Sequence, residues 1–247
     1  MNGSNNDGFL AEHDGEQRES YVAFVADRVH EVRQRIEHSR QRSAWGQSVT
    51  LVAVTKTHNS SAVEAAWQAG VVDVGENKVQ EAEEKMDAVS VPVRWHLIGH
   101  LQRNKARSAV RFDLVHSIDS ERLAKAVNDA AVGVERLQDV LIQVNVSGEE
   151  TKGGFSMNDV SAFAARLHVF RNLRVVGAMT MAPFDATEAE LRTIFGGARR
   201  VRDELAKEGH PASELSMGMS GDFEIAVEEG ATLVRLGTVL FGNRAST

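Results

Sequence analysis

Cysteine is absent from the 247 residues of this sequence. Its absence excludes disulfides, zinc–thiolate sites, iron–sulfur clusters and cysteine nucleophiles together. Positive charge is also in short supply, because 28 lysine and arginine residues stand against 35 aspartate and glutamate residues, for a net charge of -7. That balance offers no basic footprint for nucleic acid. We therefore expect no nucleic-acid partner, and the lack of cysteine fits a cytoplasmic protein.

Long hydrophobic runs are missing as well. No apolar stretch approaches the ~18 residues that a membrane-spanning helix needs. The first eight residues are polar and slightly acidic, without the basic segment and apolar core of a signal peptide. We therefore expect neither a membrane partner nor a secretion signal.

The order of polar and apolar segments predicts the fold. Residues 1–16 show no period, and we expect a disordered tail there. We expect a single domain over residues 17–247, opened by a helix from about Glu19 to Ala44 with apolar residues at helical spacing. Eight short apolar segments then alternate with helical ones, at about residues 49–55, 71–75, 92–99, 112–118, 138–146, 173–179, 214–217 and 232–237.

Strands that are apolar throughout are typical of parallel sheets covered on both faces. Eight of them, alternating with helices, predict the α/β class and a (β/α)8 barrel of the TIM type with an extra N-terminal helix. An open doubly wound sheet is the alternative.

One lysine stands at the end of the first of these strands. The run Val49–Val54 is β-branched and apolar, and it ends in Thr55, Lys56 and Thr57. The carboxyl ends of strands form the functional face of a barrel. A solvated surface lysine is the ordinary alternative, since lysines are mostly exposed.

Two other strand ends carry glycines and hydroxyls. Residues 216–221, Ser-Met-Gly-Met-Ser-Gly, follow the seventh strand, and Leu236, Gly237 and Thr238 close the eighth. Glycines permit close backbone approach, and helix N-termini and hydroxyls supply donors for an anion. Barrels frequently bind phosphate after strands seven and eight, so we expect a phosphate site here, with ordinary turn glycines as the alternative.

A phosphate site facing a buried lysine points to pyridoxal 5′-phosphate (PLP), because a desolvated amine forms a Schiff base with an aldehyde. Arg235 would face the pyridine nitrogen of PLP and disfavour its protonation, which makes the ring a poor electron sink. A salt bridge at the barrel end is the alternative for Arg235. Asn77 is expected either to bond the ring hydroxyl or to cap the helix that follows it. We expect no metal, since the strand–loop context of His96 and His100 breaks the helical spacing of a metal site.

Several longer motifs resemble the pyridoxal-phosphate homeostasis proteins, the single-domain relatives of the alanine racemase barrel. The similarity covers residues 20–243, and its most specific motifs are Trp-His-Leu-Ile-Gly-His-Leu-Gln-Arg-Asn-Lys at 95–105 and Leu-Ser-Met-Gly-Met-Ser at 215–220. The resemblance implies a barrel of PLP fold type III and an internal aldimine between PLP and Lys56. It also implies phosphate contacts from Ser220, Gly237 and Thr238, and a contact from Arg235 to the pyridine nitrogen.

The same resemblance implies a carrier or buffer of PLP, in cofactor homeostasis, that influences amino-acid and keto-acid pools without established catalysis. Apo forms of PLP-dependent enzymes would be its partners, and a monomer is expected. The sequence departs from the family at Lys78, where a tyrosine is common, so Lys78 is a second candidate amine.

A weak amino-acid racemase of the alanine racemase type is the alternative function. A two-base racemase needs a second acid or base opposite the lysine. In alanine racemases this is a tyrosine on a second domain, which we expect to be missing because the chain ends after the eighth strand. The sole tyrosine, Tyr21, lies in the N-terminal helix. A scaffold that senses the cofactor and regulates a partner is a third class that the sequence leaves open.

Overall fold

The computed structural model describes residues 6–149 and 153–242. The strands are β1 (Thr50–Val54), β2 (Asp73–Glu76), β3 (Arg94–Leu97), β4 (Leu114–Ile118), β5 (Gln138–Asn145), β6 (Phe155–Ser156), β7 (Leu173–Met179), β8 (Glu214–Ser216) and β9 (Leu233–Leu236). The α-helices are α1 (Asn6–Arg42), α2 (Ser60–Gln68), α3 (Val79–Ala88), α4 (Ala106–Ala109), α5 (Glu121–Val132), α6 (Met157–Arg166), α7 (Glu188–Lys207), α8 (Phe223–Glu228) and α9 (Thr238–Phe241). Two 3-10 turns complete the helices, η1 (Arg103–Lys105) before α4 and η2 (Leu167–Val169) after α6.

Parallel pairing closes the sheet into a barrel. The strand order is β4-β3-β2-β1-β9-β8-β7-β5, and β4 pairs with β5 to complete the ring. All of these pairs are parallel, and β6 only adds a two-residue pairing to β5. The (β/α)8 barrel is therefore confirmed, and the open-sheet alternative is wrong.

Burial on both faces of the strands explains their apolar sequences. A small cluster from five strands packs together inside the ring, formed by Val52, Leu114, Leu141, Met179 and Leu233. The alternate residues of the strands join the large core between sheet and helices. Side chains therefore fill the interior of the barrel, as in other barrels of this size, and chemistry is confined to its ends.

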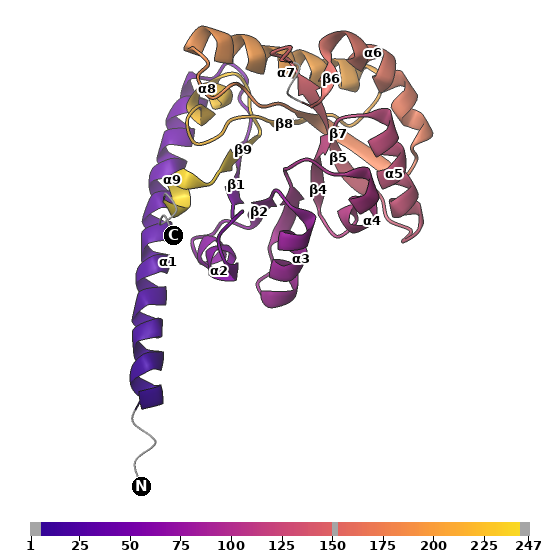
Figure 1. Ribbon diagram of the computed structural model, residues 1–247. Coiled ribbons are helices and arrows are strands. Elements are labelled where there is room, and N and C mark those ends of the chain that lie inside the picture. Colours follow the sequence, from indigo (N-terminus) through magenta and orange to yellow (C-terminus); the bar gives the residue numbers. More distant parts are fainter. Residues whose placement is uncertain (1–5, 150–152, 243–247) are drawn as a thin grey trace.

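The N-terminal helix lies along one side of the barrel, beside α2, α8 and α9 (Figure 1). Val25, Val29, Val32 and Ile36 recur every three or four residues and are buried against the core. Within the described residues, none of the helices combines the length and apolar character required to cross a bilayer.

The predicted start of this helix is wrong. Residues 6–16, expected to be part of a disordered tail, belong to α1, which begins at Asn6. Once a helix is nucleated, adding each further residue costs little, and Leu10, Ala11 and Glu12 are good helix formers within this stretch. The described part of the chain leaves out residues 1–5 of the expected tail and residues 243–247 of the expected domain.

Candidate functional site

Lys56 lies in a turn that follows β1, on the face where the carboxyl ends of the strands meet. Its side chain is exposed, which corrects the expectation of a buried, desolvated amine. Burial ends with Thr55, because β1 stops at Val54 and the backbone then turns outward. The solvated-lysine alternative therefore describes the exposure correctly, while the position on the functional face agrees with the barrel prediction.

Hydrogen bonds fix the backbone on both sides of Lys56. The His58 N–H donates to the Thr55 carbonyl oxygen at 3.0 Å, which closes the turn. Thr57 has a φ of 66°, in the left-handed region that costs a β-branched residue about 1–3 kcal/mol. The Thr57 N–H donates to the Glu81 carboxylate, from the first turn of α3. Contacts from a neighbouring element therefore hold the lysine turn in an unusual backbone conformation.

A buried lysine, which the sequence analysis did not identify, underlies this turn. Lys85 on α3 is 5% exposed, and its Nζ donates to the Thr55 carbonyl at 2.7 Å, to Glu76 Oε1 at 2.7 Å and to Glu81 Oε1 at 2.9 Å. Thr55 Oγ1 also donates to Glu76 Oε1 at 2.5 Å. Lys85 thus links Thr55, which precedes Lys56, to the carboxylate of Glu81, which binds Thr57.

The pKa values of the two carboxylates, Glu76 and Glu81, are shifted in opposite directions. Burial raises the pKa of Glu76, and the hydrogen bonds from Lys85 and Thr55 offset only part of that rise. Burial also acts on Glu81, but there the hydrogen bonds from Lys85 and the Thr57 N–H outweigh it and lower the pKa. Among the described residues, Glu76 Oε2 is buried without a partner. The group is therefore a costly buried ion pair, and any change that leaves one charge alone should destabilise the fold.

Asn77 follows β2 directly and is half-buried. The residue that caps α3 is Lys78, without a side-chain hydrogen bond, so the expected alternative of Asn77 as helix cap is wrong. The loop after β3 presses against it, because a Cβ added to Gly99 would lie 2.3 Å from the Asn77 carbonyl oxygen. Only glycine allows this close approach. The contact holds Asn77 next to the Lys56 turn, on the face formed by the carboxyl ends of the strands. Lys78 is exposed.

The loops after β8 and β9 supply the glycines and hydroxyls expected of an anion site. Gly218 has a φ of +94°, and an added Cβ would lie 2.7 Å from Ala226 Cβ, so the loop passes close to α8. Gly237 is the N-cap of α9 and lies against Val54, two residues before Lys56. Ser220 is half-buried and Thr238 exposed.

These loops fit a phosphate group. Neither the Ser220 nor the Thr238 hydroxyl has a hydrogen-bond partner among the described residues. Gly221 has open space around it. Since β1 and β9 are neighbours in the barrel, the hydroxyl of Thr238 and the amine of Lys56 come from adjacent strand ends. The donor set therefore matches an anion bound beside the lysine.

Arg235 is almost completely buried in β9. Its Nη1 donates to Ser216 Oγ at 2.5 Å and its Nη2 to the Thr180 carbonyl oxygen at 3.0 Å. Burial lowers the pKa of Arg235 to about 10, although Asp222 opposes the shift, so the guanidinium is charged at neutral pH. In the described part of the chain no carboxylate forms an ion pair with Arg235, so the salt-bridge alternative is wrong. Of its five N–H donors, three are left for a ligand.

The two histidines after β3 do not share a site. His96 is buried and bonds His116 and Asp73, whereas His100 is exposed, with its Nδ1 3.3 Å from Asp119 Oδ2. His100 also lines an open hollow with Gln102, Arg103 and Asn104. Over the residues described, no group of three or more potential ligands is arranged to hold a metal ion.

A buried histidine makes the stability of the fold depend on pH. Burial, with smaller effects from His96 and Arg235, lowers the pKa of His116 well below its ordinary 6.5. Below pH 6.5 the unfolded chain binds a proton that folded His116 does not, so stability falls as pH falls. Burial shifts the pKa of His210 in the same direction. We expect His116 alone to contribute up to about 1.4 kcal/mol of lost stability per pH unit below that value.

Urea unfolding of the intact chain and of His116→Leu between pH 7.5 and 5.5 measures this contribution. The slope of unfolding free energy against pH should be shallower in the variant, because leucine cannot take up the proton. Equal slopes would contradict a neutral, buried His116.

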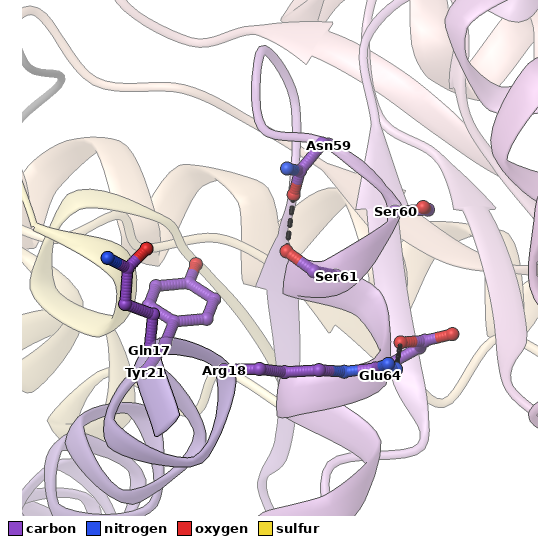
Figure 2. Close-up of a pocket in the computed structure, with 7 residues that line it drawn as sticks. All are labelled: Gln17, Arg18, Tyr21, Asn59, Ser60, Ser61 and Glu64. Carbon is purple, nitrogen blue, oxygen red and sulfur yellow. Dashed lines mark hydrogen bonds and ion pairs between the residues drawn. The ribbon is translucent and has the colours of Figure 1, made fainter. Parts of the chain in front are cut away.

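The sole tyrosine, Tyr21, lines a hollow whose lining does not include Lys56 in the described part of the chain. Tyr21 is half-buried on α1, and it lines a hollow of about 500 Å³ between α1 and the start of α2 (Figure 2). The hollow is also lined by Gln17, Arg18, Asn59, Ser60, Ser61 and Glu64. Burial raises the pKa of Tyr21. Among the described residues Lys56 does not line this hollow, so the tyrosine and the amine do not face one another across a common pocket.

Comparison with known proteins agrees with this fold. Residues 28–245 match the family model described as alanine racemase, N-terminal domain. The alanine racemase of Streptomyces lavendulae superposes with a TM-score of 0.73 at 18% identity, over 93% of this chain and 58% of that one, which bears on the fold alone. The class is therefore the alanine racemase type of barrel.

Closer relatives narrow this class. The pyridoxal phosphate homeostasis protein of Aquifex aeolicus is 39% identical over 224 residues, 89% of this chain and 98% of the relative. The one from Escherichia coli is 36% identical over 229 residues, 89% of this chain and 97% of the relative. The structure of PipY from Synechococcus elongatus with PLP bound has a TM-score of 0.78 at 37% identity, over 88% of this chain and all of that one. The chain belongs to the pyridoxal phosphate homeostasis protein family.

Proposed function

We propose that this protein binds PLP through Lys56 and acts as a carrier or buffer of the cofactor. The observation that carries the proposal is that two adjacent strands end side by side. The exposed Lys56 turn follows β1, and Gly237 and Thr238 follow β9. We call this edge of the barrel the rim. The PLP-bound structure of PipY, at 37% identity, supports the choice of ligand.

Each rim residue has a proposed task. The hydroxyls of Ser220 and Thr238 and the close-approach backbone at Gly237 hold the phosphate, and Asn77 bonds the ring hydroxyl. Arg235 donates to the ring nitrogen with an N–H that its protein partners do not use. When PLP is bound, its aldehyde can condense with the amine of Lys56. This condensation releases water and links the cofactor covalently to the lysine. The turn held by Glu81 and Lys85 keeps that amine at the rim.

Three features favour a carrier over an enzyme. A charged arginine donates a hydrogen bond to the ring nitrogen but keeps its own proton. The ring nitrogen therefore stays unprotonated, and the ring withdraws electrons weakly. The only tyrosine lies in the hollow between α1 and α2 and not with Lys56. The exposed amine is open to exchange with solvent and with other proteins, as a carrier requires. Weak racemization is the alternative activity.

The remaining parts of the proposal concern the surroundings of the protein. We infer that it works as a monomer in the cytoplasm and delivers PLP to apo forms of PLP-dependent enzymes. The absence of cysteine and the exposure of the lysine turn support this setting. A scaffold that binds PLP as a signal would share the site but would not deliver its ligand.

A transfer experiment tests the carrier function. The protein is loaded with PLP, freed of excess ligand, and mixed with an apo-aminotransferase, whose return of activity is followed against an equal amount of free PLP. We expect activation faster than the spontaneous release of PLP from the loaded protein, measured separately with a small-molecule trap. Activation no faster than release would contradict a carrier and leave a buffer or sensor. Steady turnover of alanine enantiomers would favour the racemase.

A further inference from the structure

A series of hydrogen bonds crosses the inside of the barrel behind Arg235. Ser216 Oγ, which accepts from Arg235, lies 2.8 Å from His116 Nδ1. His116 Nε2 is 2.9 Å from His96 Nδ1, and His96 Nε2 is 2.9 Å from Asp73 Oδ1. We call Ser216, His116, His96 and Asp73 the interior network.

The network joins the two ends of the barrel. Arg235 and Ser216 lie toward the carboxyl ends of β9 and β8, whereas Asp73 is the first residue of β2, at the amino end. β4, which carries His116, is separated from β9 by three strands on either side of the ring, so the bonds cross the interior. All four residues are less than 5% exposed. Polar groups this deep are costly unless every member is satisfied, so their arrangement is expected to be specific.

The Asp73 end of the network determines the direction of the bonds when His96 is neutral. Arginine can only donate, so Ser216 accepts from it and its own hydroxyl hydrogen is free for His116. At the far end burial raises the pKa of Asp73, but His96 and Arg94 together outweigh it, and the pKa is lowered. The ionised carboxylate can only accept, so His96 must donate from Nε2.

With His96 neutral, its Nδ1 is an acceptor, and it can only receive the Nε2–H of His116. The Nδ1 of His116 is then left to accept from the Ser216 hydroxyl. The low pKa of His116 agrees with a neutral ring. The donors therefore run in one direction, from Arg235 through Ser216 and the two histidines to Asp73.

We propose that the interior network consists of positioning residues for Arg235, with both histidines in the Nε2–H form and all donors directed away from the guanidinium. Ser216 then offers Arg235 only lone pairs, and with the Thr180 carbonyl it holds the guanidinium plane at two points. The remaining N–H groups are kept in one orientation for the ring nitrogen of PLP. The choice of PLP as the ligand rests on the proposed function, whereas the hydrogen bonds of the interior network do not depend on it.

The first arm of the test uses no cofactor. Long-range ¹H–¹⁵N spectra of the unloaded, histidine-labelled chain at pH 7.5 report which nitrogen of each ring carries the proton, with His96→Gln and His116→Leu serving for assignment. We expect Nε2–H for both rings. A proton on Nδ1 of His116, or a doubly protonated His96, would overturn the proposed direction.

The second arm compares PLP with its 1-deaza analogue, in which C–H replaces the ring nitrogen. A hydrogen bond from a charged donor corresponds to about a 10-fold or larger preference for PLP. We expect Ser216→Ala to lose most of this preference by weakening PLP more than the analogue, and the exposed Ser213→Ala to retain it. An equal loss of affinity for both ligands would mean a merely structural role and would overturn the proposal. Failure of the unaltered chain to bind either ligand would instead contradict the proposed function, and the first arm would still decide the network.

Discussion

Replacing Lys56 by alanine is expected to abolish the visible absorbance band that the PLP-loaded protein should show. The band arises from the conjugated linkage between the aldehyde and an amine, and Lys56 supplies the amine at the rim beside β9. The phosphate loops and Arg235 remain in the variant, so PLP should still bind reversibly through these contacts, with weaker affinity. An absorbance spectrum after desalting, together with equilibrium dialysis, measures both effects.

Lys78→Ala is the matched control for this variant. Lys78 is also exposed and is the cap residue of α3, next to Asn77 in sequence, so it is a second candidate amine at this rim. We expect its variant to keep the band and the affinity of the unaltered chain. Loss of the band in Lys78→Ala and its survival in Lys56→Ala would reverse the assignment.

Replacing Lys85 by alanine should give the largest loss of stability among the variants of the site. The substitution leaves Glu76, which is fully buried, without its cation, and it removes the donor to the Thr55 carbonyl. Removing one partner of a buried ion pair typically costs about 3–5 kcal/mol. Urea unfolding measures the change, and the looser turn should also lower the affinity for PLP.

Two further variants separate charge from packing. Lys125→Ala breaks an exposed pair with Asp129 at 2.6 Å, and it should change stability little, because solvent screens the charges of an exposed pair. Lys85→Met combined with Glu76→Gln removes both buried charges at similar volume, and it should recover much of the stability lost in Lys85→Ala. A loss in Lys85→Ala no greater than in Lys125→Ala would contradict a buried ion pair under the lysine turn.

The barrel could be predicted from the sequence because its pattern is local. Each strand is a short apolar run followed by a turn and a helical segment, and eight such units leave few topologies. The start of α1 could not be predicted in the same way. Residues 6–16 lack an apolar period, and they are helical as a continuation of a helix nucleated further along the chain.

The placement of Lys56, Asn77 and Thr238 could also be predicted, because each of them lies within two residues of the end of a strand. Lys56, Asn77 and Thr238 lie at the strand ends where the sequence placed them, whereas the exposure of Lys56 was misjudged from the buried run before it. The supporting residues were missed. Lys85 lies in the middle of an amphipathic helix, and His116 lies in the middle of a strand. Their roles depend on partners 30 and 100 residues away, Thr55 and Ser216.

The attachment of PLP to Lys56 is the central claim, and it can be tested by locating the covalent bond. Borohydride adds hydride to the linkage of the loaded protein and converts it to a stable secondary amine, which survives proteolysis and can be mapped by mass spectrometry. We predict a single modified peptide that contains Lys56, with the peptide that contains Lys78 unmodified. Modification of Lys78 or of another lysine in place of Lys56 would contradict the account.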